Sequence, residues 1–314
     1  MLLLERGNWW RQIATFRGTA ITRVWPRLLF VTLLASIETA LHVNGYWTLH
    51  GLTVVPFSLV AVALGIFLGF RNNTSYDRFW EGRKLWGQLV NTTRSFTRQV
   101  QVLVGPHHEA LGVTPDAAAI HRELVHRVIA YVHALRQHLR DEDDPAELAR
   151  LLPAAELDAL RGQHNRPIAI LSTLGARLRD LWCQGHVDPL HVPVLEQTLV
   201  VLTDIQGGCE RIKSTPIPSS YTVLIHRIVA IYVFALPFGL VDTIGVLTPL
   251  VVAFIGYAFF GLDAVGEEIE DPFGTDVNDL PLTTLSRMIE INLRQALGET
   301  ELPEPVRPVD GVLL

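Results

Sequence analysis

Two long runs of apolar residues restrict the fold of this chain more than any other feature of its sequence. Residues 52–70, from Leu52 to Phe70, span 19 positions, residues 245–262 span 18, and neither run contains a charged side chain. About 20 such residues cross the hydrocarbon core of a bilayer. Since 49% of all residues are hydrophobic and only 18% are charged, the sequence predicts an integral membrane protein.

Two shorter apolar segments accompany these runs. Residues 28–41 and 228–241 each have 14 positions before a charged flank, and the first contains Glu38. On length alone, each could be a buried or interfacial helix and not a membrane span.

The placement of basic residues favours four spans. Basic residues lie before and after the first hairpin, and Arg211, Lys213 and Arg227 lie before the third apolar segment, whereas the links 42–51 and 242–244 contain none. The positive-inside rule then places both links outside and both chain termini in the cytoplasm. We therefore expect a multi-pass protein of the cell (inner) membrane.

An all-α fold with five regions follows from this pattern. Residues 120–139 carry apolar side chains at three- and four-residue steps, which predicts an amphipathic helix. Breaks between helices are predicted at Pro106, Pro115, the acidic run that ends at Pro145, Pro153 and Pro167. The predicted regions are a cytoplasmic N-terminal segment (1–27), a first transmembrane hairpin (28–70), a cytoplasmic helical domain (71–220), a second hairpin (221–266) and a cytoplasmic C-terminal segment with its tail (267–314).

Several function classes find little support. A net charge of -6 gives no basic face for nucleic acid. Cys183 and Cys209 are too few for a disulfide framework, and we expect both to be packed internally as thiols. Glu123, His126, His133 and His138 share one helix, but their spacing matches no zinc motif. We expect solvated helix faces for these histidines, although they leave a membrane-bound metal-dependent enzyme as an alternative.

The segment 52–70 carries two adjacent stripes. Its small residues Ala61, Gly65 and Gly69 repeat every four positions and would permit close helix packing. Its large residues Val62, Ile66 and Phe70 repeat in the same way one position later. Around a symmetry axis the large residues would form three apolar rings spanning about 12 Å, a constriction of the kind that gates by dewetting. Ordinary helix packing is the alternative.

Directly after these stripes, the run from Phe70 to Gly87 resembles the post-helix signature of bacterial bestrophin homologues. Three further stretches agree with the same family, in order along nearly the whole chain: Arg17-Gly18-Thr19, Gly207-Gly208-Cys209-Glu210-Arg211 with Pro216-Ile217-Pro218, and Glu270-Asp271-Pro272-Phe273-Gly274-Thr275.

The resemblance implies a homopentameric channel with one axial pore. By position, Val62, Ile66 and Phe70 match the residues of its neck, and Leu190 matches its cytosolic aperture. Without the family, Leu190 would be interpreted as a core residue. The resemblance leaves the sign of the conducted monovalent ion open, because eukaryotic members pass chloride and prokaryotic relatives have been regarded as favouring cations. A non-conducting membrane scaffold is the other alternative to a channel.

A calcium site is a further prediction. Asp271, Asp276 and Asp279 supply hard oxygen ligands within nine residues, and the resemblance places Asp276 and Asp279 at calcium-ligand positions of eukaryotic members. Asp271 and Asp279 could instead cap helices. We expect no cofactor to be required.

Overall fold

The computed structural model describes residues 9–13, 15–16, 18–46, 53–105, 117–309 and 311–313. Over these ranges the chain is helical, and the strand-like pairings are two isolated bridges, Val104 with Val187 and Val309 with Val312. The all-α prediction is therefore confirmed. Arg17, of the first family motif, and Leu52, the predicted start of the second apolar segment, lie outside the described residues.

The chain divides into two compact units. The first, here the apolar unit, comprises Leu2–Trp80 and Thr215–Pro272; the second, the amphipathic unit, comprises Glu81–Ser214 and Phe273–Leu314. The limits predicted after residues 70, 220 and 266 all fall inside the apolar unit. Helix α3, Val54–Leu103, contributes residues to both units because it continues without a break past Phe70.

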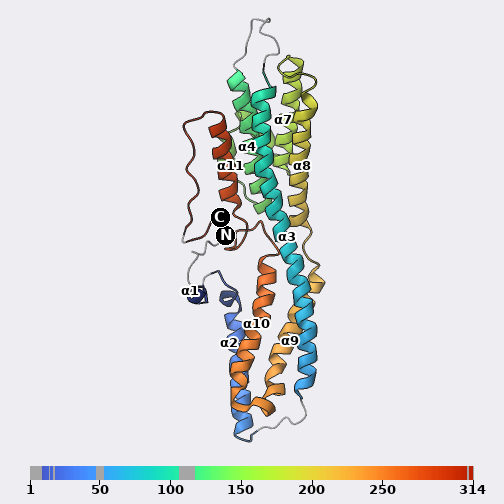
Figure 1. Cartoon of the computed structure of the whole chain (residues 1–314), viewed down its shortest axis with the longest axis vertical. Helices are drawn as coiled ribbons and strands as arrows, with labels where there is room; N and C mark the ends of the chain where they lie inside the picture. Colours follow the sequence, from blue (N-terminus) through green and yellow to red (C-terminus); the bar gives the residue numbers. More distant parts are fainter. Residues whose placement is uncertain are drawn as a thin grey trace. The chain divides into compact units, whose positions relative to one another are not determined.

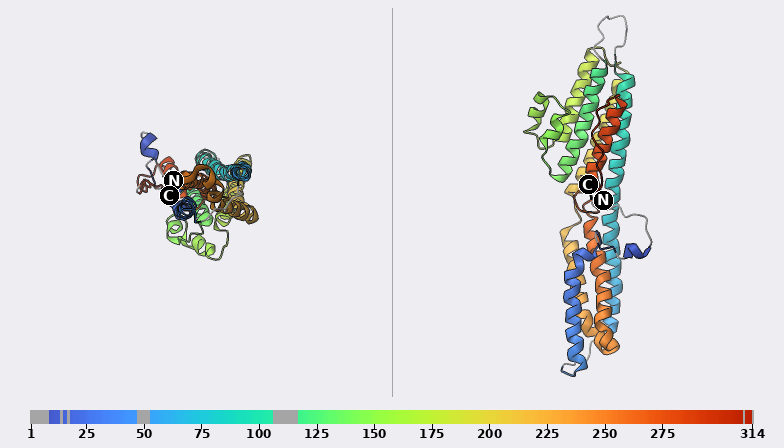
Figure 2. Two further views of the ribbon diagram at one scale, coloured as in Figure 1. Left: turned by 90° about the horizontal axis from the view of Figure 1, so that it is seen from below. Right: turned by 90° about the vertical axis from the view of Figure 1, so that its left-hand side faces the viewer.

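The apolar unit is built from long helices that run side by side (Figures 1 and 2). These are α2 (Ile21–Val43), the first part of α3, α9 (Ser219–Ile244) and α10 (Thr248–Glu268), preceded by the short α1 (Trp9–Ile13). Between α9 and α10 the chain turns through a 3-10 segment, Gly245–Leu247, and Gly245 has φ 53°, which a side chain would disfavour.

Length and composition make three helical runs of the described chain able to cross a membrane. They are Ile21–Val43, Val54–Leu103 and Ser219–Glu268, the last of which contains both α9 and α10. The shorter predicted segments, 28–41 and 228–241, thus lie within longer helices. The total of four spans stays a prediction.

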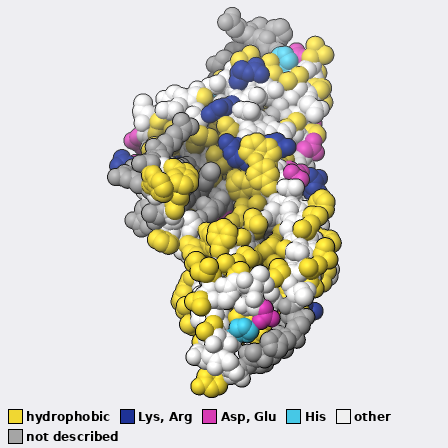
Figure 3. All heavy atoms as spheres, turned by 60° about the horizontal axis from the view of Figure 1, so that its bottom comes forward, with side chains coloured by type: hydrophobic (Ala, Val, Ile, Leu, Met, Phe, Trp, Pro, Cys, Tyr) yellow, Lys and Arg dark blue, Asp and Glu magenta, His cyan; other side chains and the backbone are white. Residues whose placement is uncertain are grey.

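The core of the apolar unit consists of side chains that the four long helices turn toward one another. Val31 of α2, Leu64 of α3, Val233 of α9 and Val252 of α10 are all buried in one cluster. Many hydrophobic side chains also lie on the outside: Figure 3 shows them on one face, and Phe254 is 75% exposed. An apolar outside around an apolar inside is the distribution expected for helices in lipid, where van der Waals packing holds the helices together.

Helix α4, Ala117–Arg140, is the centre of the amphipathic unit. It packs against α5 (Pro145–Ala149), α7 (Arg166–Cys183), α8 (Val192–Ser214) and α11 (Leu282–Ala296). All six apolar positions of its predicted stripe are buried: Ile120, Leu124, Val128, Val132, Leu135 and Leu139. Because partners surround the helix, polar residues on its other faces are buried too.

Local signals place the short helices of this unit. Asp144 caps α5 by accepting a hydrogen bond from the Ala146 N–H at 3.1 Å, with Pro145 as first helical residue. Pro153 precedes α6, Ala154–Leu160, and Asn165 caps α7 before Pro167. The breaks predicted at Pro145, Pro153 and Pro167 are therefore confirmed, whereas Pro106 and Pro115 lie outside the described residues. Figure 2 shows α5 and α6 projecting from the side of α4 and α7.

The two cysteines differ in environment. Cys209 is buried, as predicted, whereas Cys183 is exposed. The prediction of a packed Cys183 was wrong because α7 ends at this residue, where a helix turns into a surface loop.

Candidate pore-lining site

The three predicted neck residues lie on the outside of the chain. Val62 is 64% exposed, Ile66 54% and Phe70 63%. Their four-residue spacing on helix α3 places them on one face. Since Leu59 and Phe67 are exposed as well, exposure alone does not identify the pore face, but it shows that packing within the chain does not use these three side chains.

Helix α3 packs within its own chain through a different face. Leu64 and Leu68 are each 1% exposed and belong to the core of the apolar unit. Ala61 packs against that core, but a side chain added at Gly65 or Gly69 would meet nothing within 4 Å. The two glycines therefore leave an open strip of backbone beside Val62, Ile66 and Phe70.

One residue after Phe70, an ion pair fixes α3 against α10. The Arg71 guanidinium is 1% exposed, and its Nη1 donates to Oδ1 of Asp263 at 2.5 Å. Asp263 is 2% exposed, so both charges are withdrawn from solvent. A buried pair of this kind adds little net stability but penalises any register in which either charge loses its partner. It thus sets the position of Phe70 along the helix axis.

A second arginine, about two helical turns further along α3, makes the same kind of connection. Arg78 Nε donates to the Glu270 carbonyl oxygen at 3.1 Å, and its Nη1 donates to the carbonyl oxygen of Thr215. The Glu270 carboxylate in turn accepts the Ile217 N–H at 3.0 Å. Both arginines were interpreted from sequence as cytoplasmic flanking charges. Asp263 and Glu270, which they contact, each lie 192 positions away in the sequence. The one sequence signal for these contacts is that both acidic residues follow the fourth apolar run.

Leu190, the predicted aperture residue, lies in the loop between α7 and α8 and is 81% exposed. Its N–H donates to Oδ1 of Asp188 at 2.8 Å. The loop is anchored by the Val104–Val187 bridge and by the Gly105 N–H, which donates to the His186 carbonyl at 2.8 Å. Leu190 is therefore not a core residue: an anchored loop presents its apolar side chain to the outside.

The predicted calcium ligands have other roles where the structure shows their contacts. Oδ2 of Asp279 accepts the Asp276 N–H at 2.7 Å, and Asp279 is 5% exposed. Within the described ranges, no three His, Cys, Asp or Glu side chains are grouped so that they could hold a metal ion. Calcium binding through Asp271, Asp276 and Asp279 stays a prediction.

The histidines of α4 are not all on solvated faces. His133 is fully buried, with Nε2 3.0 Å from Oε2 of Glu290 and Nδ1 3.1 Å from Oε1 of Glu147. The expectation of a solvated face was wrong for His133 because α5 and α11 cover that side of α4. His126 contacts Glu299 at 2.8 Å and His138 contacts Glu210 at 3.2 Å, so each is paired with a carboxylate.

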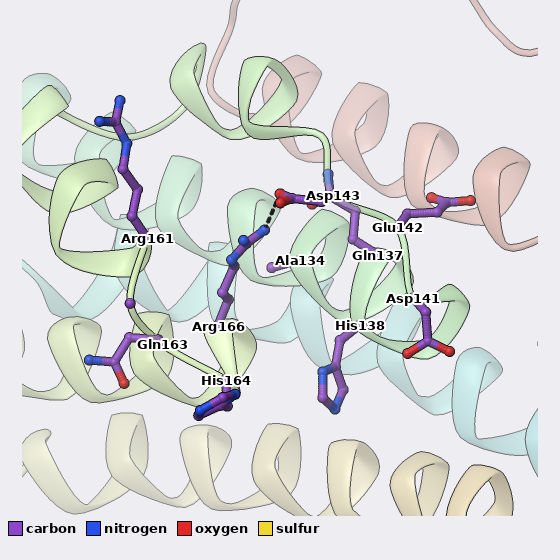
Figure 4. Close-up of a pocket in the computed structure, with 11 residues that line it drawn as sticks. Ala134, Gln137, His138, Asp141, Glu142, Asp143, Arg161, Gln163, His164 and Arg166 are labelled. Carbon is purple, nitrogen blue, oxygen red and sulfur yellow. Dashed lines mark hydrogen bonds and ion pairs between the residues drawn. The ribbon is translucent and has the colours of Figure 1, made fainter.

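A polar cavity of about 410 Å³ lies beside α4, with His138, His164 and Arg166 in its wall (Figure 4). Its charges are matched locally. Arg166 Nη1 lies 2.6 Å from Oδ1 of Asp143, and Asp141 accepts from Lys213 at 2.6 Å. Such internal pairing indicates a structural role for the cavity wall.

Comparison with known proteins identifies the family. The model of the family described as Bacterial/Fungal Bestrophin protein matches residues 1–295. A relative from Ralstonia nicotianae, named a voltage-dependent anion channel-forming protein, is 43% identical, with 96% of each chain covered. A protein with the same descriptive name from Escherichia coli K12 is 36% identical over 98% of each chain.

Solved structures agree. A bacterial bestrophin homologue from Klebsiella pneumoniae superimposes with a TM-score of 0.81 at 35% identity, covering 88% of this chain and 100% of the other. A variant of that homologue with a single substitution gives the same values. With a family model across most of the sequence and relatives matched over nearly their full length, this chain belongs to the bacterial and fungal bestrophin family.

Proposed function

We propose that this protein is a bestrophin-type ion channel of the inner membrane, a homopentamer whose five α3 helices surround one pore. Four helices of each subunit, α2, the first part of α3, α9 and α10, would cross the bilayer, with the amphipathic unit and both termini in the cytoplasm. Val62, Ile66 and Phe70 would form the neck and Leu190 the cytosolic aperture. Family membership and channel-named relatives support a channel and not an enzyme.

One observation carries the assignment of the pore. Helix α3 packs inside its chain through Leu64 and Leu68 and leaves Val62, Ile66 and Phe70 outside. An exposed apolar stripe next to an open glycine strip suits a helix with two external contacts: the strip allows a neighbouring subunit to approach closely, and the stripe turns to the axis.

We further propose that the pore favours monovalent anions. The support is the descriptive name shared by the relatives from Ralstonia nicotianae and Escherichia coli, both called anion channel-forming proteins. A neck of apolar rings has no formal charge, so the preference must come from charges elsewhere along the pore.

The test is conductance of purified protein in planar bilayers or liposomes. Wild type should conduct. Phe70→Ala should raise single-channel conductance, roughly twofold, because a ring of five phenyl groups is removed from an apolar constriction. Leu190→Ala should raise it in the same direction.

Phe67→Ala is the matched control, because Phe67 is 49% exposed on the same helix but points about 100° away from Ile66 and about 60° away from Phe70. Absence of any current from wild-type protein would refute the channel. Equal effects of Phe67→Ala and Phe70→Ala would refute the assignment of the pore face while leaving the channel standing.

A further inference from the structure

The part of α3 that belongs to the amphipathic unit carries four cations and no anion beyond Glu81. Residues 82–103 contain Arg83, Lys84, Arg94 and Arg98, and neither Asp nor Glu. All four side chains are exposed. None of them forms an ion pair or side-chain hydrogen bond with any residue that the structure describes.

This lack of partners contrasts with the rest of the same unit. Arg127 lies 3.0 Å from Glu156, Arg136 2.7 Å from Glu147, and Arg177 2.8 Å from Glu123. A chain with a net charge of -6 has acids to spare, yet this helix face receives none. Without acidic partners in the chain, these exposed cations keep their positive charge facing the solvent, where it can attract anions.

The four cations do not all point in the same direction from the axis of α3. Phe70, Asp77, Lys84, Asn91 and Arg98 follow one another at intervals of seven residues, which is about two turns, and all five are exposed. The direction drifts by about 20° per seven residues of a straight helix, which adds up to about 80° from Phe70 to Arg98, the same angle that separates Phe70 from Val62 within the stripe. Lys84 and Arg98 therefore continue the stripe of Phe70, whereas Arg83 points about 100° away from Lys84.

We propose that Lys84 and Arg98 line the ion path beyond the neck and give the pore its preference for anions. The inference rests on the proposed function, because only an oligomer with α3 at its axis turns each residue into a ring of five positive charges. Fixed rings of cations raise the local concentration of anions and lower that of cations. Asp77 is the acid on the same stripe, and Glu81 lies beside it but pairs with Arg211 at 2.5 Å.

For ions inside the pore, the two rings of positive charge matter more than the negative net charge of the subunit, because they lie closer to the ions. Lys84 and Arg98 are 14 residues apart, about 21 Å along the helix axis. At physiological salt the Debye length is about 8 Å, so each ring acts on ions that pass beside it, whereas acids on the outer surface are screened from the pore.

The experiment measures reversal potentials in a KCl gradient for wild type, Lys84→Gln, Arg98→Gln, the double variant and Arg83→Gln. In the double variant the chloride-to-potassium permeability ratio should fall roughly threefold, because a change of about half of kT/e acts with opposite sign on the two ions. Each single variant should show part of that fall. Arg83→Gln removes the same charge from a neighbouring position and should leave the ratio unchanged.

An unchanged ratio in the double variant, or an equal fall with Arg83→Gln, would overturn the inference while the channel stands. Absence of current from wild type would instead refute the proposed function. If a glutamine variant does not assemble, Lys84→Cys in a Cys183→Ser background replaces it. Modification of that cysteine in the open channel with a positively charged methanethiosulfonate should raise the ratio, and with a negatively charged one should lower it; equal responses would again overturn the inference.

Discussion

His133 is the residue whose charge state most directly affects the amphipathic unit. Its ring lies between Glu147 of α5 and Glu290 of α11, so one side chain connects three helices. Arg136 pairs with Glu147 at 2.7 Å, and Arg287 and Arg294 pair with Glu290 at 3.0 and 3.4 Å. Burial lowers the pKa of His133, but its contacts with the two carboxylates more than offset this and hold the pKa above the usual 6.5.

The pH dependence follows from the direction of these shifts. A raised pKa means that the contribution of protonated His133 is complete below about pH 6.5 and is lost as pH rises through the higher folded-state value. Although burial raises the pKa of Glu147 and Glu290, the contacts with His133 lower both below 4.5, so their contributions are lost only in acid. The cluster should be most stable between these limits.

We therefore predict that His133→Gln lowers the free energy of unfolding by about 2 kcal/mol at pH 6, because both carboxylates lose a buried cation but keep their arginines. The loss should shrink as the pH rises through the raised folded-state pKa of His133, because the wild-type histidine then loses its proton. Thermal unfolding of the detergent-solubilised protein across this range measures it. Parallel pH curves for wild type and variant would contradict the assigned protonation.

At the scale of elements, a glycine on helix α3 and a glycine of α9 that faces α3 should respond differently to substitution. A side chain at Gly239 of α9 would collide with the Phe57 ring of α3, whereas one at Gly65 meets nothing within 4 Å of its own chain. Gly239 thus reports on packing inside the chain, and Gly65 on contacts that the chain makes with others.

We predict that Gly239→Ala destabilises the fold by about 2 kcal/mol through overpacking. Gly65→Leu should leave the folded chain intact but prevent close approach of a neighbouring subunit. Size-exclusion chromatography in detergent separates the two: the first variant should lose yield and thermal stability, the second should elute as smaller species. Normal assembly of Gly65→Leu would show that the glycine strip is not a subunit contact.

Sequence predicts the helices of this fold better than their partners. Hydropathy located the apolar helices, and the apolar periodicity from Ile120 to Leu139 identified the central helix, because both signals are local. The sequence did not reveal that Arg71 is buried against Asp263 or that His133 contacts Glu290. Those pairs are 192 and 157 residues apart, and their formation depends on how the helices pack. Exposure of Leu190 likewise follows from the loop anchored by Val187.

For the whole molecule, the two cysteines provide a natural probe of topology. Cys183 is exposed, whereas Cys209 is buried and burial raises the pKa of its thiol to about 12. Thiolates are the reactive species toward maleimides. An impermeant maleimide should therefore label Cys183 and spare Cys209 wherever the amphipathic unit is accessible.

If that unit is cytoplasmic, right-side-out vesicles should stay unlabelled and inverted vesicles should take up one label per subunit. Cys183→Ser should abolish the signal, which makes it the control for reaction at Cys209. The same labelled protein tests stoichiometry, since five chains of 35.0 kDa give an assembly of about 175 kDa by light scattering after subtraction of detergent. Labelling of right-side-out vesicles would contradict the orientation inferred from the basic residues. A mass that matches another number of chains would exclude the pentamer, and with it the rings of five side chains that the pore assignment requires.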